Sequence, residues 1–164
     1  MKLKKLLSLA LSLMLILSAV PMGLFSITAS AETATSGTTG DCTWTLDGTV
    51  LTISGSGSME NYTYSNSLPR GNSITEVIIK TGVAGIGDYA FSGCSGLARI
   101  KIPDSVMSIG NGTFEDCVEL TSVNIPNSIT SINYSVFFGC KGLVNITIPD
   151  SVTIIGEDAF SGCT

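Results

Sequence analysis

The sequence predicts a repeat solenoid built mainly of short β-strands, with turns or helical bends between them. Three observations predict it. Residues of one type recur every 23 positions along the second half of the chain, each repeat holds an alternating apolar segment that ends at proline, and a hairpin signal precedes the first repeat. One such unit cannot bury its apolar face alone, so neighbouring units must stack. We therefore expect a curved stack of coils with a parallel sheet along one side.

Residues 1–31 have the pattern of a secretory signal peptide. A basic start precedes an apolar run at residues 6–20, and Ala29 and Ala31 provide the small side chains that a signal peptidase requires. A membrane anchor is the alternative, but the run is shorter than the roughly 20 apolar residues that span a bilayer. We expect cleavage after Ala31, export from the cell and no membrane insertion of the remaining chain.

Cleavage changes the charge of the protein. The full sequence has a formal net charge of −5, and the signal holds three of the eight basic residues and none of the thirteen acidic ones. The exported chain therefore has five basic and thirteen acidic side chains, a net charge of −8. This balance argues against nucleic acid as a partner, because binding it requires clustered lysine and arginine. An anionic lipid surface is disfavoured for the same reason.

A β-hairpin is predicted ahead of the repeats. Residues 43–46 and 50–53 alternate between apolar and polar types and flank Asp47-Gly48, a dipeptide that favours tight hairpin turns. Such a hairpin would cap the first coil, which would otherwise expose its core and an unpaired edge.

The rest of the segment 32–73 is predicted to lack regular structure. Residues 32–39 are polar and small, which is typical of a disordered leader. Residues 54–73 are rich in serine, glycine and asparagine and are expected to form a loop.

The repeats occupy residues 74–164, with a degenerate first copy from Ile74. The positions that recur at 23-residue spacing are Ile86, Ile109, Ile132 and Ile155; Phe91, Phe114, Phe137 and Phe160; Cys94, Cys117, Cys140 and Cys163; Leu97, Leu120 and Leu143; and Pro103, Pro126 and Pro149. Within one unit, residues 97–102 are expected to form a strand in which Ile100 and Ile102 point inward. Pro103 ends this strand because it has no N–H for a ladder, and Asp-Ser or Asn-Ser turn residues follow.

The unit Leu-x-x-Ile-x-Ile-Pro-x-x-Val-x-x-Ile-Gly-x-x-x-Phe-x-x-Cys, as at residues 97–117, resembles the BspA-like, Treponema-type leucine-rich repeat of bacterial surface proteins. The copies depart from the pattern at Asn133, which replaces glycine, and at Thr113 and Val136, which replace alanine. The hairpin is similar to the N-terminal cap of these proteins. The resemblance implies a secreted or cell-surface protein that is not an enzyme and that binds host or neighbouring-cell proteins in adhesion.

The last repeat stops at Thr164, directly after Cys163 and with no capping segment. We expect a truncated array whose exposed last coil favours self-association. The alternative to adhesion is a structural spacer or targeting array of a larger exported protein, with the functional domain beyond Thr164.

The cysteines could form disulfides or a metal site, but their spacing favours a simpler arrangement. Four of the five occupy one repeat slot, which predicts a buried ladder of small apolar side chains. No close cysteine pair of the kind that binds zinc is present, and no metal or cofactor is expected. Cys42 lies outside this ladder, and its state stays open. The turn slot of Asp104, Asn127 and Asp150 could provide calcium ligands, but its neighbouring serines favour turn hydrogen bonds.

Catalysis is not predicted. The chain has no histidine, which removes the commonest general base. The adjacent acidic pairs at residues 115–116 and 157–158 fall in different repeat slots, so we interpret them as solvated turn residues.

The outer face of the strands is the candidate binding site for an extracellular protein, because repeat proteins bind partners on such extended surfaces. Its candidate residues are Glu76, Arg99, Lys101, Ser122, Asn124, Asn145 and Thr147. Arg99 and Lys101 are two of the five basic residues in the exported chain, so they are the most distinctive members of this set.

Overall fold

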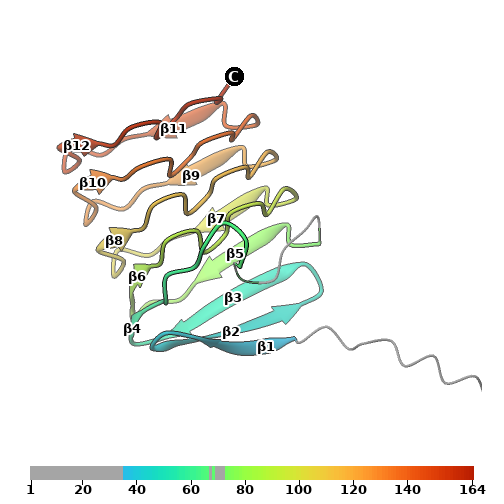
Figure 1. Ribbon diagram of the computed structural model, residues 1–164. Coiled ribbons are helices and arrows are strands. Elements are labelled where there is room, and N and C mark those ends of the chain that lie inside the picture. Colours follow the sequence, from blue (N-terminus) through green and yellow to red (C-terminus); the bar gives the residue numbers. More distant parts are fainter. Residues whose placement is uncertain (1–34, 67, 69–72) are drawn as a thin grey trace, which may run out of the picture. The chain divides into compact units, whose positions relative to one another are not determined.

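The computed structural model describes residues 35–66, 68 and 73–164, which form a stack of coils (Figure 1). The predicted signal peptide lies outside these residues. No helix is present in the described part, and the bends between strands are hydrogen-bonded turns. The strands are β1 (Ser36–Thr39), β2 (Cys42–Asp47), β3 (Val50–Gly55), β4 (Gly57–Ser58), β5 (Glu76–Ile79), β6 (Val83–Ile86), β7 (Arg99–Lys101), β8 (Ser108–Ile109), β9 (Ser122–Asn124), β10 (Ser131–Ile132), β11 (Asn145–Thr147) and β12 (Ile154–Ile155).

The main sheet runs along the whole stack in the order β1-β2-β3-β5-β7-β9-β11. The strands from β3 onward pair in parallel, as the sequence predicts. Their register brings one apolar residue from each coil into a single inward row, which consists of Leu51, Val77, Ile100, Val123 and Ile146. All but Ile146, the last of the row, are buried. The row therefore gives the stack a continuous core behind the sheet.

The predicted hairpin is confirmed. β2 and β3 pair antiparallel around the turn after Asp47, with Trp44 opposite Ile53 and Leu46 opposite Leu51. β3 also pairs in parallel with β5, so the second strand of the cap is at the same time the first strand of the solenoid. The cap is therefore joined to the repeats by a regular ladder of backbone hydrogen bonds.

The prediction of a disordered leader is wrong for residues 36–39, which form β1 and pair antiparallel with β2. These small polar residues carry no strand signal, and packing supplies the reason for the strand. Gly37 lies opposite Trp44, and a Cβ atom at Gly37 would lie 2.8 Å from the indole ring. The bare glycine therefore lets the ring lie flat against β1, where Trp44 is 8% exposed.

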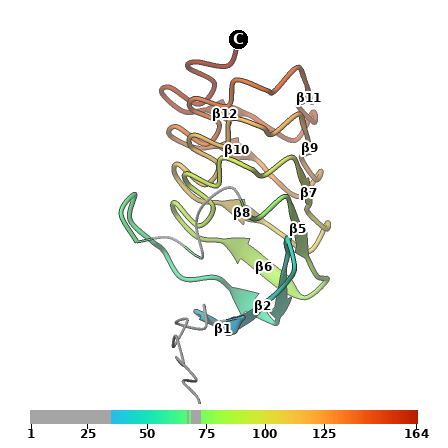
Figure 2. The ribbon, with the colours of Figure 1, turned by 90° about the vertical axis from the view of Figure 1, so that its right-hand side faces the viewer.

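The prediction of a loop over residues 54–73 is wrong in part, because a coil begins within this segment. β4 pairs in parallel with β6, and Met59 and Leu68 are buried in the core. The stack therefore starts before Ile74, with an irregular coil that lacks the 23-residue pattern. The loop between these buried residues projects from the side of the stack away from the main sheet (Figure 2).

A second row of short strands runs beside the main sheet. It consists of a three-stranded sheet, β4-β6-β8, and a two-stranded sheet, β10-β12, both parallel (Figure 2). Its register aligns Ile86 with Ile109 and Ile132 with Ile155. The sequence indicates the apolar pairs but not this sheet, because strands of two residues are too short to show an alternating pattern.

The bends that carry phenylalanine and cysteine form a third ladder. At each step three backbone N–H groups donate to carbonyl oxygens of the next coil, for example Tyr89 to Asn111, Phe91 to Thr113 and Gly93 to Glu115. Two slots in each bend have a left-handed backbone with φ between 52° and 77°. These slots are Tyr89, Gly112, Ser135 and Asp158, and then Gly93, Asp116, Gly139 and Gly162. A non-glycine residue in this conformation costs roughly 1–2 kcal/mol, so the ladder holds some of its residues in a disfavoured geometry.

The residues that depart from the repeat pattern make their own contacts between coils. At the glycine position of the repeat, the backbone N–H groups of Gly110 and Gly156 donate to the carbonyl oxygens of Ile86 and Ile132 in the preceding coils. Asn133 occupies this slot, and its side-chain amide donates to the carbonyl oxygen of Ile109 at 2.7 Å. The Thr113 hydroxyl lies 3.2 Å from the carbonyl oxygen of Gly87 in the preceding coil and 2.8 Å from that of Gly110 in its own coil, and alanine could make neither contact. Both substitutions therefore preserve or add hydrogen bonds.

The centre of the stack is a column of phenylalanine rings, Phe91, Phe114, Phe137 and Phe160. Successive ring centroids are 5.8, 5.5 and 5.4 Å apart, with interplanar angles of 11–13°. The first three rings are fully buried. Offset stacking at these separations is the favoured arrangement of aromatic pairs, so the column adds to the burial energy of each coil.

The ring at the middle of this column should be the most sensitive to removal. We expect Phe114→Ala to lower the free energy of unfolding by about 3–5 kcal/mol, because it leaves a cavity between two further rings. Met107→Ala is the matched control, since Met107 is 70% exposed and its truncation should change stability by less than about 0.5 kcal/mol. Urea unfolding measures both values, and equal losses for the two variants would contradict the central place of the column.

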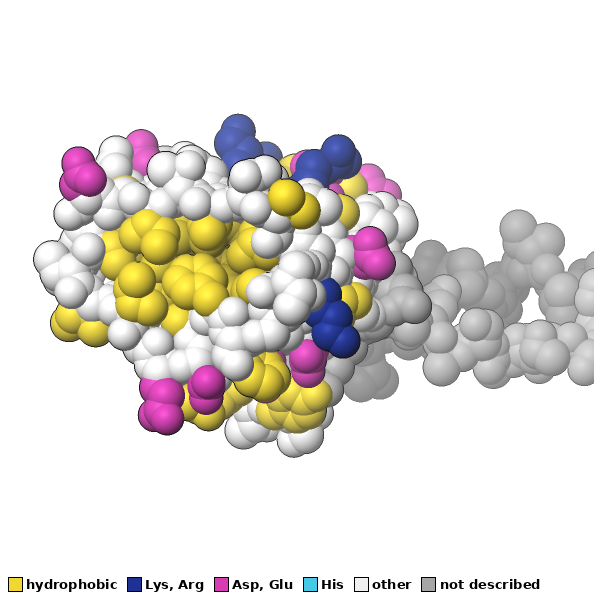
Figure 3. All heavy atoms as spheres, turned by 90° about the horizontal axis from the view of Figure 1, so that it is seen from above, with side chains coloured by type: hydrophobic (Ala, Val, Ile, Leu, Met, Phe, Trp, Pro, Cys, Tyr) yellow, Lys and Arg dark blue, Asp and Glu magenta, His cyan; other side chains and the backbone are white. Residues whose placement is uncertain are grey.

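The last coil leaves apolar side chains uncovered among the described residues. Seen along the stack from the end that carries β11 and β12, they form one continuous patch (Figure 3). Ile154 and Ile155 are 62% and 54% exposed, whereas their partners in β10 are covered by them. The opposite end differs, because the cap covers the first coil.

From this patch we expect the chain to self-associate as its concentration rises, because exposed core surface favours contact with a second copy. Ile154→Ser should weaken the association without removing buried contacts, because serine occupies the same slot at Ser108 and Ser131 in other coils. Sedimentation velocity over a range of concentrations measures it, with the Met107→Ala chain as control. A single monomeric species at all concentrations would show the prediction to be wrong.

Candidate binding surfaces

The sequence-predicted face lies on the exposed side of β5, β7, β9 and β11. The register places Glu76, Arg99, Ser122 and Asn145 in one row across the four strands. Asn124 lies beside Thr147 in a second row, and Lys101 lies beside Ile78 in the same sheet. Strands are spaced at about 4.8 Å, so all seven predicted residues fall within one contiguous surface.

The charges on this face partly cancel. A guanidinium nitrogen of Arg99 lies 3.6 Å from a carboxylate oxygen of Glu76, and the Arg99 side chain is 75% exposed. An exposed pair of this kind contributes about 0–1 kcal/mol to stability, so it is weakly held. The guanidinium can therefore exchange Glu76 for a partner's carboxylate at little expense. Lys101 is exposed on the same strand.

Small and polar side chains make up most of the rest of this face. The apolar exceptions include Val144, which is 79% exposed, and Ile78, which is partly exposed. No Trp, Tyr or Phe belongs to the four strands that form the face. Because interface hot spots are enriched in Trp, Tyr and Arg, Arg99 is the strongest candidate anchor here.

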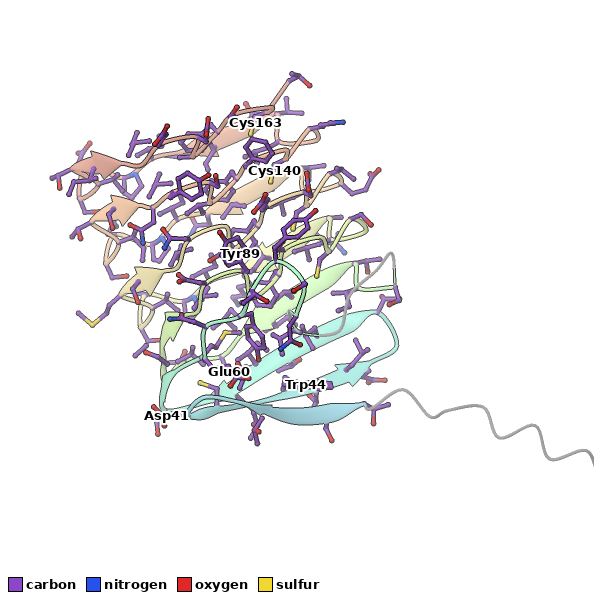
Figure 4. All side chains as sticks on the ribbon, in the orientation of Figure 1. Asp41, Trp44, Glu60, Tyr89, Cys140 and Cys163 are labelled. Carbon is purple, nitrogen blue, oxygen red and sulfur yellow. The ribbon has the colours of Figure 1, made fainter. Side chains whose placement is uncertain are left out.

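A second surface, which the sequence does not reveal, lies on the bends. We call it the bend surface and define it by Tyr64, Tyr89, Glu115, Asp116 and Tyr134. Tyr64 and Tyr134 are 53% and 47% exposed, and the Tyr64 hydroxyl donates to an Asp116 carboxylate oxygen at 3.3 Å. Tyr89 lies on the same side of the stack as the projecting loop (Figure 4). The surface therefore joins the loop of the irregular coil to three successive bends.

Electrostatics distinguish the bend surface from the strand face. Burial, and next the charge of Asp116, raise the pKa of the Glu115 carboxyl. Burial raises the pKa of Tyr89, and the neighbouring Glu115, Tyr134 and Asp88 raise it further. All these charge effects have one sign, because the ionisable groups next to Glu115 and Tyr89 are acidic.

The interpretation of the two acidic pairs as turn residues agrees with the structure, and the pair at residues 157–158 is exposed. Glu115 and Asp116 are only partly exposed, and Asp116 takes a left-handed backbone within the bend ladder. The three tyrosines lie in different slots or outside the repeats, so no periodic signal marks them. The one sequence signal for this surface is the pair of tyrosines, Tyr62 and Tyr64, in a polar segment.

The cysteine ladder is confirmed. Cys94, Cys117 and Cys140 are fully buried, and Cys163 at the last coil is partly exposed. Each thiol from Cys117 onward donates to the phenylalanine carbonyl of the preceding coil, at 3.1–3.3 Å. All five cysteines, Cys42 included, are free thiols. Cys140 and Cys163 lie on successive coils (Figure 4).

The thiols of the ladder are held in their protonated form. Burial raises the pKa of Cys140 to about 12, and it raises the pKa of Cys117 and Cys163 as well. A protonated thiol is a poor nucleophile and a poor metal ligand, so the ladder has a packing role. The described residues contain no group of three or more side chains placed to hold a metal ion.

The prediction of local turn hydrogen bonds at the serine slot is wrong. The Ser105 hydroxyl donates to Val83 at 2.9 Å and the Ser151 hydroxyl donates to Ile129 at 2.7 Å, in each case a carbonyl of the preceding coil. Ser128 contacts Val106 in the same way. The serines therefore link coils instead of closing their own turns.

The comparisons with known proteins agree with this architecture. The family model described as the BspA type leucine-rich repeat region, in six copies, matches residues 58–164, and the chain belongs to this family. The match begins before Ile74, in agreement with the early coil of the structure.

Three solved bacterial structures are similar. A Treponema pallidum leucine-rich repeat protein is 28% identical with a TM-score of 0.56, and 76% of this chain aligns with 65% of that one. A leucine-rich cell surface protein from Faecalibacterium prausnitzii is 32% identical with a TM-score of 0.59, and 79% of this chain aligns with 31% of it. A Bacteroides ovatus leucine-rich repeat protein is 29% identical with a TM-score of 0.56, and 70% of this chain aligns with 34% of it.

The chain thus spans about two thirds of the treponemal protein and about a third of the other two. The comparison with curated proteins gives no significant match. Among the described residues, no helix has the length and apolar character needed to cross a membrane.

The buried thiols predict a loss of stability at alkaline pH. In the unfolded chain a thiol ionises near pH 8.5, whereas the pKa of Cys140 in the folded chain is about 12. The unfolded state alone gains charge between these values, so the free energy of unfolding should fall as pH rises from about 8.5 to about 12. Cys140→Ala should show a shallower fall than the parent chain in urea unfolding at several pH values.

A thiol reagent provides the control for this experiment. At a pH of about 8, just below the ordinary thiol pKa, the native chain should react slowly at its buried cysteines. All five should react at once in denaturant. Identical pH slopes for Cys140→Ala and the parent would be evidence against the protonated ladder.

Proposed function

We propose that this chain is a secreted or cell-surface binding module that holds an extracellular protein on the exposed face of the main sheet, in adhesion to host or neighbouring cells. The observation that carries the proposal is the register row of Glu76, Arg99, Ser122 and Asn145, which presents four adjacent polar side chains from four coils. Backbone hydrogen bonds hold this row rigid, so little entropy is lost when a partner binds.

Arg99 is the expected centre of the contact. Its guanidinium is exposed and weakly paired, and it can form a two-pronged bond with a carboxylate of the partner. Lys101, two residues further along β7, lies on the same face and would extend the positive region. An acidic segment of an extracellular protein fits this charge.

Surface location is part of the proposal. It is supported by the signal-like residues 1–31 and by the similarity to the Faecalibacterium relative, which is described as a cell surface protein. The module acts by binding and has no enzymatic step in this proposal, because neither surface assembles a nucleophile with a base.

A spacer or targeting array of a larger protein is the second candidate. The observation that favours it is the scarcity of large side chains on the sheet face, where most residues are small and polar. A spacer would hold another module away from the cell and would bind nothing through this face.

A binding comparison separates the two. The purified chain is tested against immobilised extracellular-matrix proteins and polysaccharides, alongside Arg99→Ala and the matched control Lys141→Ala. Both variants remove one exposed positive charge, but only the first removes it from the sheet face. For adhesion we expect saturable protein binding that the first variant weakens about tenfold or more, equivalent to about 1.4 kcal/mol, and the control leaves nearly unchanged. No binding to any panel member would favour the spacer. An equal loss of binding in both variants would show that binding depends on the net charge of the chain and not on the sheet face.

A further inference from the structure

The bend surface exposes more aromatic area than any other side of the described stack. Tyr64 and Tyr134 are about half exposed, whereas the other exposed large apolar side chains are aliphatic and lie mainly on the last two coils. An exposed ring loses apolar burial unless a partner covers it. The exposed rings of Tyr64 and Tyr134 are therefore candidates for contact with a partner.

Two of the three rings lie beside one pair of carboxylates. A Cβ atom at Gly112 would lie 2.3 Å from a ring carbon of Tyr89 and 3.0 Å from a carboxylate oxygen of Glu115, so ring and carboxylate both lie over this glycine. The Tyr64 hydroxyl reaches Asp116 from the loop, and Tyr134, on the next coil, lies near Tyr89 and accepts the N–H of Gly112 at its carbonyl. Aromatic rings and negative charge thus occur together over three successive bends.

The surroundings carry an excess of negative charge in their sequence. The bends at residues 87–95, 110–118, 133–141 and 156–164 hold five carboxylates and one basic residue, Lys141. The raised pKa of Glu115 has the same origin, since burial and Asp116 both act against its charge. A bound cation would relieve this repulsion.

We propose that the bend surface binds an arginine- or lysine-rich segment of a partner protein. Carboxylates of Glu115 and Asp116 receive the cationic heads, and the faces of Tyr64, Tyr89 and Tyr134 stack against them. A cation over an aromatic ring gains a modest attraction at an exposed site and a larger one when it is desolvated. A neutral sugar could also stack on the rings but would leave the carboxylates uncompensated, so the charge favours a basic peptide.

This surface is separate from the strand face and has the opposite charge preference. The main sheet presents Arg99 and Lys101 and suits an acidic partner, whereas the bends suit a basic one. The inference therefore does not depend on the adhesion proposal, and Arg99→Ala/Lys101→Ala should leave binding to the bend surface intact.

The test is fluorescence anisotropy of labelled oligo-arginine and oligo-lysine peptides with the full chain, and oligo-glutamate serves as the negative control. Glu115→Gln/Asp116→Asn should weaken binding of the basic peptides about tenfold or more. The matched control is Asp104→Asn/Asp150→Asn, which removes the same charge from the turn slot and should change binding by less than about twofold if the effect is local. Asparagine tolerates the left-handed backbone of Asp116, so the first variant should fold.

Aromatic stacking has its own readout. Tyr134→Leu should weaken binding several-fold, whereas Tyr134→Phe retains the ring and should bind as the parent does. Circular dichroism confirms that each variant is folded. Equal losses in the two carboxylate variants, undiminished binding by Tyr134→Leu, or no binding of basic peptides at all would overturn the proposal. Binding of a neutral polysaccharide through these tyrosines, without peptide binding, would also overturn it.

Discussion

The structure depends on backbone hydrogen bonds that join each coil to the next at the bends. The backbone N–H and C=O groups of a strand already point toward the neighbouring strands. A bend can form hydrogen bonds with the next coil only if its N–H groups point along the axis of the stack. Two left-handed positions per bend achieve this, and they include Tyr89, Ser135 and Asp116, where the conformation is disfavoured. Nine such bonds connect the four bends, at 2.8–3.0 Å. The phenylalanine column and the cysteine ladder lie directly behind these bends, so the stacking distance that the bonds set is also the distance at which the rings pack.

Much of this architecture could be predicted from the sequence. A 23-residue spacing determines which side chains must be equivalent, and equivalence in a stack means contact between neighbours, so the isoleucine, phenylalanine and cysteine rows follow directly. The hairpin follows from Asp47-Gly48 and from the alternation of its flanks. Two features outside the 23-residue pattern, β1 and the first coil, could not be predicted in this way. β1 arises because Gly37 accommodates an indole ring, and the first coil contains Met59 and Leu68 in place of the repeat residues.

The two candidate surfaces illustrate the same difference. The strand face is periodic, so the exposed positions of each strand can be assigned from the spacing alone, and the register confirms their alignment in rows. The bend surface combines a loop outside the repeats with residues from non-equivalent slots, and only the three-dimensional arrangement brings Tyr64 to Asp116 and Tyr89 to Glu115. Exposed side chains that do not recur are less constrained by stacking than the recurring slots. They are therefore the places where a repeat protein can acquire individual chemistry, whereas the recurring slots serve the scaffold.

β3 belongs both to the hairpin and to the parallel part of the main sheet, and this affects how the chain folds. The β2–β3 hairpin closes a turn of two residues, so it is a local structure that can form within microseconds. Its second strand then offers a ready edge to β5, and each later coil can pair with the coil before it. A chain that folds from this hairpin would thus assemble in the order of its sequence, from one end of the stack to the other. Such vectorial assembly avoids the slow search for distant contacts that parallel sheets usually require.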